Sequence, residues 1–583
     1  LLMFQSLACY VFPPGLFMNQ RFSLCLLCLF GLAMPAWAQV ATPTPLLNEP
    51  LTQQPQRPAG EETQGLSPSH TKASPQLNKP LEDVSVDVTS YRIQGYDRLD
   101  LAAIQSLLQP YTGPGRSFED LSNAARVVGA YLQGELGLYL AYAYLPAQSV
   151  SNGEVTIAVL PGVLEAIEVV WPAQLNVDRE VIQAHLAHLK VGEVIHVSDV
   201  ERVVFLLNDL RGLTMSFAVK PGTKEGAAIL VANPKSDARL TGSLGLDANG
   251  SRFAGLYRGI ATLNWESPMG LGDSLSVSHL QSETGGLDFT LLGYTLPVGA
   301  NGLKLGVNVS QVNYRLNEDD FPLGLNGDAE SVGVFALYPL VRSRNLNLFA
   351  LLGHDHKTFT DRQSLSGLES NKTVDSVKVA LSGDLRDRWM RGGLSFFNVG
   401  MEESKTHYAN GRPFGLDDEA VALRVNYSLG RLQTLVPNRW MFWTYARGQH
   451  ALDNLDSSDQ CSLGGATGVR AFAQGEASGD SCTLFTAELR YLPKLAWFEQ
   501  RGHGLSLNLF YDEGRVELRQ DPTGRPAGFV NDRQLTGYGL GLSWEEAGEF
   551  VVNLSLAWEQ AGVRQSDPKR QSPRLFASYT QYF

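Results

Sequence analysis

The chain has 583 residues, which is too long for one ordinary domain, so we expect roughly two to four folding units. Its formal net charge of -13 argues against nucleic acid as a partner, because phosphate binding requires a basic surface. A mean hydropathy of -0.11 is too polar for a protein that crosses a membrane with helices.

Residues 1–38 have the order of charge and apolarity of a secretory signal peptide. Arg21 precedes the apolar run FSLCLLCLFGLAM, and Ala36-Trp37-Ala38 has the small residues of a cleavage site. We expect translation to start at Met18 and cleavage to follow Ala38. A membrane anchor is disfavoured by length, since a spanning helix needs about 18 apolar residues. The CLLC motif within this run is then removed with the peptide.

Between the signal peptide and residue 238, the sequence predicts a linker followed by two copies of one pattern. Residues 39–82 are rich in Pro, Gln, Thr and Ser and have no apolar periodicity, which is typical of a linker. Residues 83–162 and 163–238 each predict the order strand, helix, helix, strand, strand. Predicted capping boxes open the second helix of each copy, at Ser117 with Asp120 and at Ser198 with Glu201. The recurrence indicates two related α+β modules.

From residue 239 to Phe583 the helical signals vanish and apolar residues alternate with small polar ones. In LKLGVNVS, at 303–310, four aliphatic residues share one face of a strand, opposite Lys, Gly, Asn and Ser. We can place 16 such strands, joined by short turns that alternate with generally longer loops. This rhythm predicts a closed antiparallel barrel in an outer membrane. A soluble β-sandwich or propeller is the alternative, disfavoured by the signal peptide, the rhythm and the aromatic end at Phe583.

Four stretches, in this order, resemble motifs of the two-partner secretion transporters of the TpsB type, the haemolysin secretion/activation protein family. LPAQ at 145–148 resembles the end of the family's first POTRA module, and residues 243–275 resemble its opening barrel hairpin. LGGATGVRAF at 463–472 resembles its GG…VRG(F/Y) loop, and LFYDEG at 509–514 its F-x-D-x-G strand. The resemblance implies two POTRA modules ahead of a 16-stranded barrel. Besides Arg470 and Asp512, the residues that match the family motifs are Pro146, Gln148, Gly464, Gly465, Val469, Phe472, Phe510 and Gly514.

The resemblance implies that residues 452–482 fold back into the pore and that Arg470 at the loop tip pairs with Asp512. The alternation in LSLNLFYDE agrees with this, because it turns Asp512 towards the lumen, where a charge is tolerable. In a wet lumen we expect the pair to contribute about 0–1 kcal/mol and to act by holding the loop in one pose. A solvated loop charge with no partner is the alternative for Arg470.

Two cysteines remain beyond the signal peptide, Cys461 and Cys482, and they flank the loop. Disulfides persist in the compartment that a signal peptide implies, so we predict that this bond closes the loop. Two free thiols are the alternative. The sequence departs from the family motif at Ala471, where glycine would permit a positive φ. Residues 39–82 contain too many prolines for the plug helix that the family can carry.

The histidine pairs are weak candidates for chemistry. His354 and His356 share one strand face but have no third ligand, so we expect a polar pair near the rim rather than a metal site. His185 and His188 lie three apart on a predicted helix and fit a surface or half-buried position. No G-x-x-x-x-G-K-[ST], G-x-S-x-G or H-E-x-x-H motif occurs, so we expect neither an enzyme nor a bound cofactor or metal.

The resemblance implies an outer-membrane translocator of a Gram-negative bacterium, with its modules in the periplasm. We expect a monomer that captures an unfolded partner exoprotein, lies in outer-membrane lipid and is inserted by the barrel assembly machinery. A BamA-type assembly factor and a passive porin-like channel are the alternatives. The sequence does not identify the exoprotein.

Overall fold

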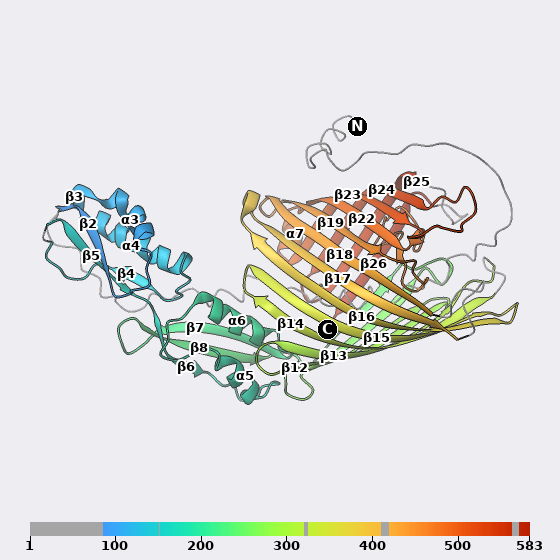
Figure 1. The fold of residues 1–583 in the computed structure, drawn as a ribbon, viewed down its shortest axis with the longest axis horizontal. Coiled ribbons are helices and arrows are strands. Elements are labelled where there is room, and N and C mark those ends of the chain that lie inside the picture. Colours follow the sequence, from blue (N-terminus) through green and yellow to red (C-terminus); the bar gives the residue numbers. More distant parts are fainter. Residues whose placement is uncertain (1–84, 151, 320–323, 410–418, 563–570) are drawn as a thin grey trace.

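The computed structural model describes residues 85–150, 152–319, 324–409, 419–562 and 571–583. The predicted signal peptide and the predicted linker lie outside these residues. Figure 1 shows a barrel with two modules at one end, the second module lying between the first module and the barrel. Within the described residues, no helix combines the length and apolarity needed to cross a bilayer.

In the first module two helices pack on one face of a three-stranded sheet. The sheet has the order β2-β5-β4, with β2 parallel to β5, and its buried face includes Val155 and Ile157. The predicted capping box is present, because Ser117 and Asp120 accept each other's backbone N–H. The first strand predicted for this module is interrupted at Thr89, which divides it into the two strands β1 and β2. The elements are β1 (Ser85–Val88), β2 (Ser90–Gln94), α3 (Leu101–Leu108), η2 (Gln109–Tyr111), β3 (Gly113–Ser117), α4 (Phe118–Gly134), β4 (Tyr142–Tyr144) and β5 (Glu154–Leu160).

The second module repeats this plan. Its sheet has the order β6-β8-β7, with β6 parallel to β8, as β2 is to β5. The predicted cap at Ser198 is wrong, because α6 begins two residues earlier than predicted, at Val197, and its N-cap, His196, makes no side-chain hydrogen bond. The carboxylate of Glu201 instead accepts the backbone N–H of Arg344 in the barrel, at 3.2 Å. The elements are β6 (Val163–Val169), α5 (Arg179–Leu186), α6 (Val197–Asn208), β7 (Leu213–Pro221) and β8 (Ala227–Ser236).

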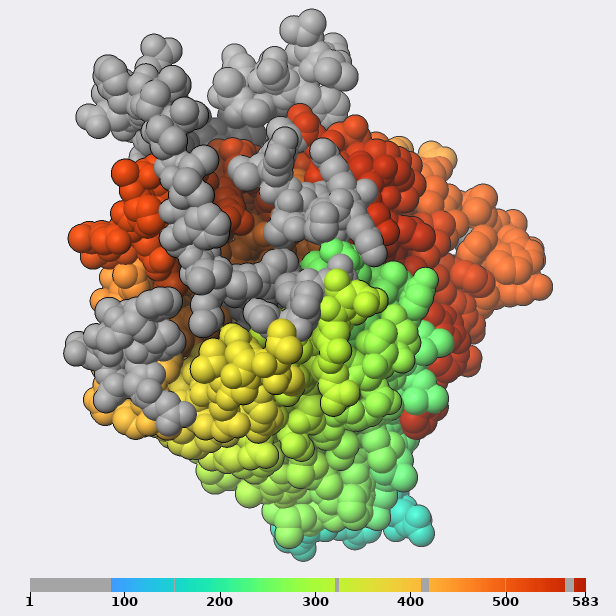
Figure 2. Space-filling view, turned by 90° about the vertical axis from the view of Figure 1, so that its right-hand side faces the viewer, coloured from blue at the N-terminus to red at the C-terminus, as the bar shows by residue number. Residues whose placement is uncertain are grey.

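Sixteen antiparallel strands close into a barrel, as predicted. The first and last strands, β9 and β26, pair with each other and complete the ring. Seen from the end away from the modules, the wall surrounds a central hollow (Figure 2). The strands are β9 (Leu240–Asp247), β10 (Arg258–Glu266), β11 (Ser274–Ser282), β12 (Leu287–Val298), β13 (Leu303–Arg315), β14 (Leu325–Arg342), β15 (Leu346–Gln363), β16 (Leu368–Asp387), β17 (Gly393–Tyr408), β18 (Glu419–Val436), β19 (Trp440–Ala451), β22 (Ser481–Tyr491), β23 (His503–Glu517), β24 (Asp532–Glu546), β25 (Phe550–Gly562) and β26 (Arg574–Tyr582).

The outer surface of the barrel is apolar. On β13, Leu305, Val307 and Val309 are 39–46% exposed, whereas the inward Ser310 is 6% exposed. A barrel wall in contact with lipid requires exposed aliphatic side chains at every second residue of its strands. Strands β14, β15, β16 and β18 have 18–20 residues, about twice the length needed to cross a membrane, so their ends extend beyond the bilayer.

The second module is docked on the short-turn rim of the barrel through a buried ion pair. Asp209, at the end of α6, accepts two hydrogen bonds from Arg342 of β14, at 2.7 and 2.9 Å. Lys304 donates to the Asp209 carbonyl at 2.9 Å, and the backbone N–H of Asp178 donates to the carbonyl of Gly270 in a barrel turn. These contacts fix the orientation of the module at the mouth of the barrel.

We predict that this docking depends on pH. Burial alone would raise the pKa of Asp209, but the hydrogen bonds and charge of Arg342 outweigh burial and lower the pKa below its usual value. A lowered carboxyl pKa contributes stability that is complete above the unfolded pKa of about 3.9 and is lost as the pH falls through the folded value. Distances between spin labels on α5 and on the barrel turn at 343–345 should therefore broaden below about pH 4.

The matched control is Asp209→Asn, which leaves Arg342 buried without its counter-ion. We expect docking in this variant to be weaker by about 3–5 kcal/mol at neutral pH and to lose its acid transition. A wild-type distance distribution that stays unchanged from pH 7 to pH 3 would exclude the ion pair as the main docking contact.

Candidate functional site: a loop anchored inside the barrel

The segment between β19 and β22 folds back into the lumen. Its two ends pair as β20 (Cys461–Ser462) and β21 (Ser478–Gly479). Gln449, which faces inward from β19, donates to the backbone carbonyls of Asp459 and Asp480 at 2.9 and 3.0 Å. The resemblance implied an inward loop over 452–482, and the structure places the loop at 452–480, since β22 begins at Ser481.

The loop tip is packed against the inner wall of the barrel. Phe472 and Val469 are 0% exposed, and together with Leu463 they belong to one apolar cluster with the wall residues Leu484 and Leu535. Gly514 of β23 leaves room for this contact, because a Cβ there would lie 2.9 Å from Leu463 and from Val469. The loop tip is therefore packed against the inner wall of the barrel and is not surrounded by water.

Two tip glycines and the alanine that departs from the family motif have a steric explanation. A Cβ on Gly464 would lie 2.0 Å from the Ala473 carbonyl oxygen, and Gly465 has a φ of +106°, which favours glycine. Ala471 does not have a positive φ and is 1% exposed, so the alanine introduces no backbone strain. The side chain of Ala471 instead packs beside Gly537 of β24.

Arg470 binds two carboxylates of the barrel wall. Its Nε and Nη2 each donate to Asp512 at 2.8 Å, its backbone N–H donates to the same carboxylate at 3.1 Å, and its Nη1 donates to Glu488 at 2.9 Å. The guanidinium carbon lies 3.4 Å from the ring centroid of Phe510. Thr486 of β22 donates a further hydrogen bond to Asp512 at 3.0 Å. Every donor and acceptor of this contact is thus on a rigid strand or on the loop tip.

The expectation of a solvated pair is wrong, because the cluster is buried. The side chains of Arg470, Glu488 and Asp512 are 12%, 7% and 0% exposed. Removing one partner of a buried pair costs about 3–5 kcal/mol, since an uncompensated charge remains. Sequence reasoning missed Glu488, although the alternation of TAELRY on β22 turns Thr486, Glu488 and Arg490 to the same face.

A second anchor, which sequence reasoning missed entirely, holds the beginning of the loop. Asp456 is paired with Lys372 of β16 and accepts a hydrogen bond from Tyr408 of β17. Asp459 lies 2.9 Å from Arg424 of β18. Burial alone would raise the pKa of Asp456, but the Lys372 ammonium outweighs it and lowers the pKa. The loop is therefore held by ion pairs to β16–β18 near its start and to β22–β23 at its tip.

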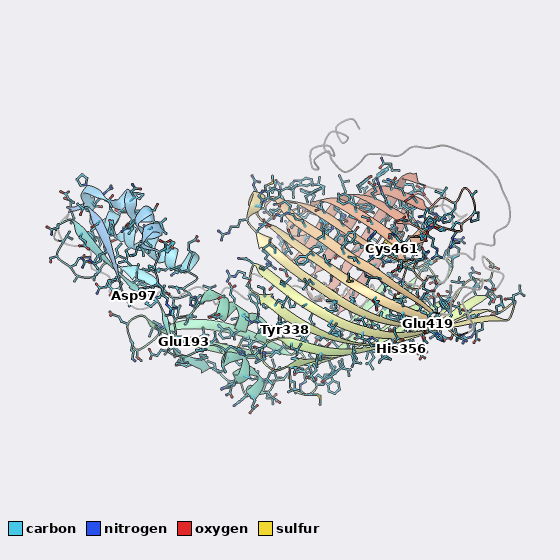
Figure 3. The ribbon with its side chains drawn as sticks, viewed as in Figure 1. Asp97, Glu193, Tyr338, His356, Glu419 and Cys461 are labelled. Carbon is cyan, nitrogen blue, oxygen red and sulfur yellow. A yellow bond between two sulfur atoms is a disulfide. The ribbon has the colours of Figure 1, made fainter. Side chains whose placement is uncertain are left out.

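The predicted disulfide is confirmed, because Cys461 and Cys482 are bonded, with their Cα atoms 6.3 Å apart. The bond joins β20 at the start of the loop to β22 in the barrel wall. Figure 3 places Cys461 within the outline of the barrel, among the strands of the second half of the chain.

The remaining predicted residues lie outside this site. Gln148 exchanges two hydrogen bonds of 2.7 Å with the backbone of Thr156 on β5, beside Pro146, and so supports the sheet of the first module. Phe583 exchanges backbone hydrogen bonds with Gly242 of β9, at 2.9 and 3.0 Å, where the barrel closes.

Two of the histidines have hydrogen-bond partners on other elements. His356 lies towards the end of the barrel away from the modules (Figure 3) and is paired with Asp375 at 2.8 Å. His185 is buried in the second module, and His188 contacts Asn301 in a barrel turn at 2.9 Å. Among the residues that the structure describes, no three His, Cys, Asp or Glu side chains are grouped to hold a metal ion.

The lipid-facing barrel, the inward loop and the two modules at one rim define an outer-membrane β-barrel transporter with periplasmic POTRA modules. Residues 226–544 match the haemolysin secretion/activation protein family ShlB/FhaC/HecB, and residues 86–162 match the ShlB-type POTRA domain. The chain belongs to this family, as the resemblance implied, and is a transporter of two-partner secretion.

Known proteins similar to this chain include transporters from two genera. The heme/hemopexin transporter protein HuxB of Haemophilus influenzae is 26% identical over 462 residues, covering 77% of this chain and 79% of that protein. The outer membrane transporter CdiB of Escherichia coli is 23% identical over 440 residues, covering 72% and 71%.

Solved structures support the fold. CdiB from Escherichia coli has a TM-score of 0.66 at 18% identity and covers 93% of this chain and 98% of that one. BamA from Haemophilus ducreyi, lacking POTRA domains 1–3, has a TM-score of 0.51 at 14% identity and covers 85% of this chain and 100% of that one. At these identities the likeness concerns the fold alone.

We predict that Arg470→Ala releases the loop tip. The change leaves two buried carboxylates without a counter-ion, so the anchoring should weaken by about 3–5 kcal/mol. Arg470→Lys keeps the charge but loses the planar fork, and an intermediate effect is expected. The measurement is cleavage of the loop by added protease in the folded barrel. Arg515→Ala is the control, because Arg515 is 61% exposed and its pair with Glu513 is worth about 0–1 kcal/mol. Equal protease resistance of Arg470→Ala and wild type would contradict the anchoring role.

We predict that reduction changes the gel mobility of the denatured chain, and that Cys461→Ser abolishes this change. Closing a loop of this kind stabilises the folded state by roughly 3 kcal/mol. The loop in Cys461→Ser should therefore exchange its amide hydrogens faster than in wild type, while the barrel strands remain protected. Identical migration of wild type with and without reductant would show that the bond does not form in the cell.

Proposed function

We propose that this transporter captures one large, unfolded exoprotein with its POTRA modules and passes it through the barrel to the cell surface. The observation that carries the proposal is the loop held by ion pairs within the lumen of a closed barrel. Such a loop narrows the pore when no exoprotein is present. Its anchors are ion pairs between side chains, and these can be replaced by contacts with the exoprotein. Folding of the exoprotein outside the cell would supply the driving force.

The modules offer the client a first contact at the edges of their sheets. The edge strands are β2 and β4 in the first sheet and β6 and β7 in the second. An extended segment can add to such an edge through backbone hydrogen bonds, which requires no particular client sequence. The docking of the second module at the barrel mouth would then deliver the client to the lumen.

The names of the relatives indicate the class of client. HuxB is named a heme/hemopexin transporter protein, and HpmB of Proteus mirabilis and ShlB of Serratia marcescens are named hemolysin transporter proteins. From these names we extend to this chain only that its cargo is a partner protein. The proposal that this partner is large and β-helical comes from the family resemblance. The choice between an adhesin and a cytolysin is left to the test.

The division of the chain belongs to the same proposal. A signal peptide that ends at Ala38 directs export to the periplasm and is removed, residues 39–82 form a linker, and the modules span 83–162 and 163–238. The barrel over 239–583 is inserted into outer-membrane lipid by the barrel assembly machinery and functions as a monomer, without nucleic acid.

Deletion of the gene tests the proposal against its alternatives. We expect one exoprotein, encoded beside the transporter gene, to be retained in the periplasm while the other outer-membrane proteins keep their abundance. Loss of many barrel proteins at once would favour an assembly factor. Normal export of all proteins, with only a change in permeability to small solutes, would favour a passive channel.

A further inference from the structure

Three aromatic side chains form a patch on the inner wall of the barrel. Phe396 of β17 lies 5.2 Å from Trp443 and 6.0 Å from Tyr445, both of β19, and the two β19 rings are stacked at 6.1 Å, all measured between centroids. We call these three residues the inner aromatic patch. Its rings are only partly buried, so part of their surface is open to the lumen.

The strand register shows that the patch faces inward. Trp443 and Tyr445 share their face of β19 with Arg447, which donates to the Thr467 carbonyl of the loop at 2.9 Å. Phe442, on the opposite face, is 37% exposed and points to lipid. Lipid therefore contacts Phe442 and has no access to the inner aromatic patch.

Gly430 of β18 leaves room for the ring of Phe396. Gly430 is paired with Phe396 on one side and with Tyr445 on the other, and a Cβ on Gly430 would lie 2.0 Å from the Phe396 ring. The Phe396 ring thus lies over the bare backbone of β18 at Gly430. With the two rings of β19 it forms an aromatic surface on the inner face of the wall, where a water-filled barrel usually carries polar side chains.

The patch adjoins the anchor of the loop tip. Trp443 is paired in register with Glu488 of β22, which holds Arg470. Arg490 joins the two, because it lies 2.7 Å from Glu488 and its guanidinium carbon is 5.1 Å from the Trp443 ring centroid. The patch lies within a few residues of the strand ends at the module-side rim, since β17 begins at Gly393 and β19 at Trp440. The patch therefore lies beside the loop-tip anchor, near the module-side rim.

We propose that the inner aromatic patch is a contact site for the translocating exoprotein, which it binds in extended form through aliphatic and aromatic side chains. The inference rests on the proposed export function. An unfolded chain exposes apolar side chains that water solvates poorly, and aromatic faces bind such groups with little dependence on sequence. The contacts are weak and open to the lumen, so the chain can move from one side chain to the next.

The proposal is tested by site-specific crosslinking in cells that produce the full transporter. Tyr445 is replaced by a photoreactive phenylalanine derivative, and export is stalled by fusing a stably folded domain to the end of the exoprotein. We expect a crosslink to the exoprotein from position 445 that is about ten-fold stronger than from position 442. No crosslink from 445, equal crosslinks from both positions, or a crosslink from 445 only to residues 39–82 of the transporter itself would overturn it.

A kinetic measurement gives an independent readout. Trp443→Leu keeps bulk but removes the aromatic face, and we expect export to slow by about two- to ten-fold, the range of one aromatic contact. Phe442→Leu, on the lipid side of the same strand, should export at the wild-type rate. Heat-modifiable gel migration identifies variants that assemble, and only these are compared.

The outcomes separate this inference from the export function. If wild type exports no exoprotein, the proposed function fails. If wild type exports, while Trp443→Leu exports equally fast and position 445 gives no crosslink, export stands and the patch serves only to cover Gly430.

Discussion

The structure depends on the need to pair every backbone group of a sheet that lies in lipid. Hydrocarbon offers no partner for an N–H or a carbonyl, so the sheet must close on itself. Pairing of β9 with β26 meets this requirement, and the last residue, Phe583, bonds to Gly242 at the closure. Closure creates an interior that is shielded from lipid, and this interior holds buried charges such as Asp512 and Arg424.

The interior is organised by ion pairs as well as by the apolar cluster around the loop tip. The loop after β19 brings Asp456, Asp459 and Arg470 to wall residues of opposite charge. Each of these charges was removed from water on folding, so each requires its partner. The same property makes the loop suited to a regulated path, because a buried ion pair is strong when complete and unfavourable when one partner is displaced.

At the module end of the molecule, too, a charge that is removed from water has a partner of opposite charge. Asp209 is largely buried at the rim and is matched by Arg342 and by the ammonium of Lys304 nearby. Docking joins an α+β module, which could fold by its own core, to a barrel that folds in a membrane. The ion pair therefore holds the second module at one end of the barrel.

The sequence by itself determined the repeated modules, the strand-by-strand alternation, the inward direction of Asp512 and the pairing of the two cysteines. These follow from local periods of 2 and 3.6 residues and from a cysteine count. The cap at Ser198 was mispredicted, because a tertiary contact of Glu201 with the barrel replaced a local one. Only the tertiary structure decided that Arg470 is buried, that Glu488 shares it, that Asp456 and Asp459 anchor the loop and that Phe396 meets Trp443 and Tyr445 across Gly430. Each of these depends on which strands are neighbours and in what register, and sequence alternation fixes the face of a residue but not its partner across the sheet.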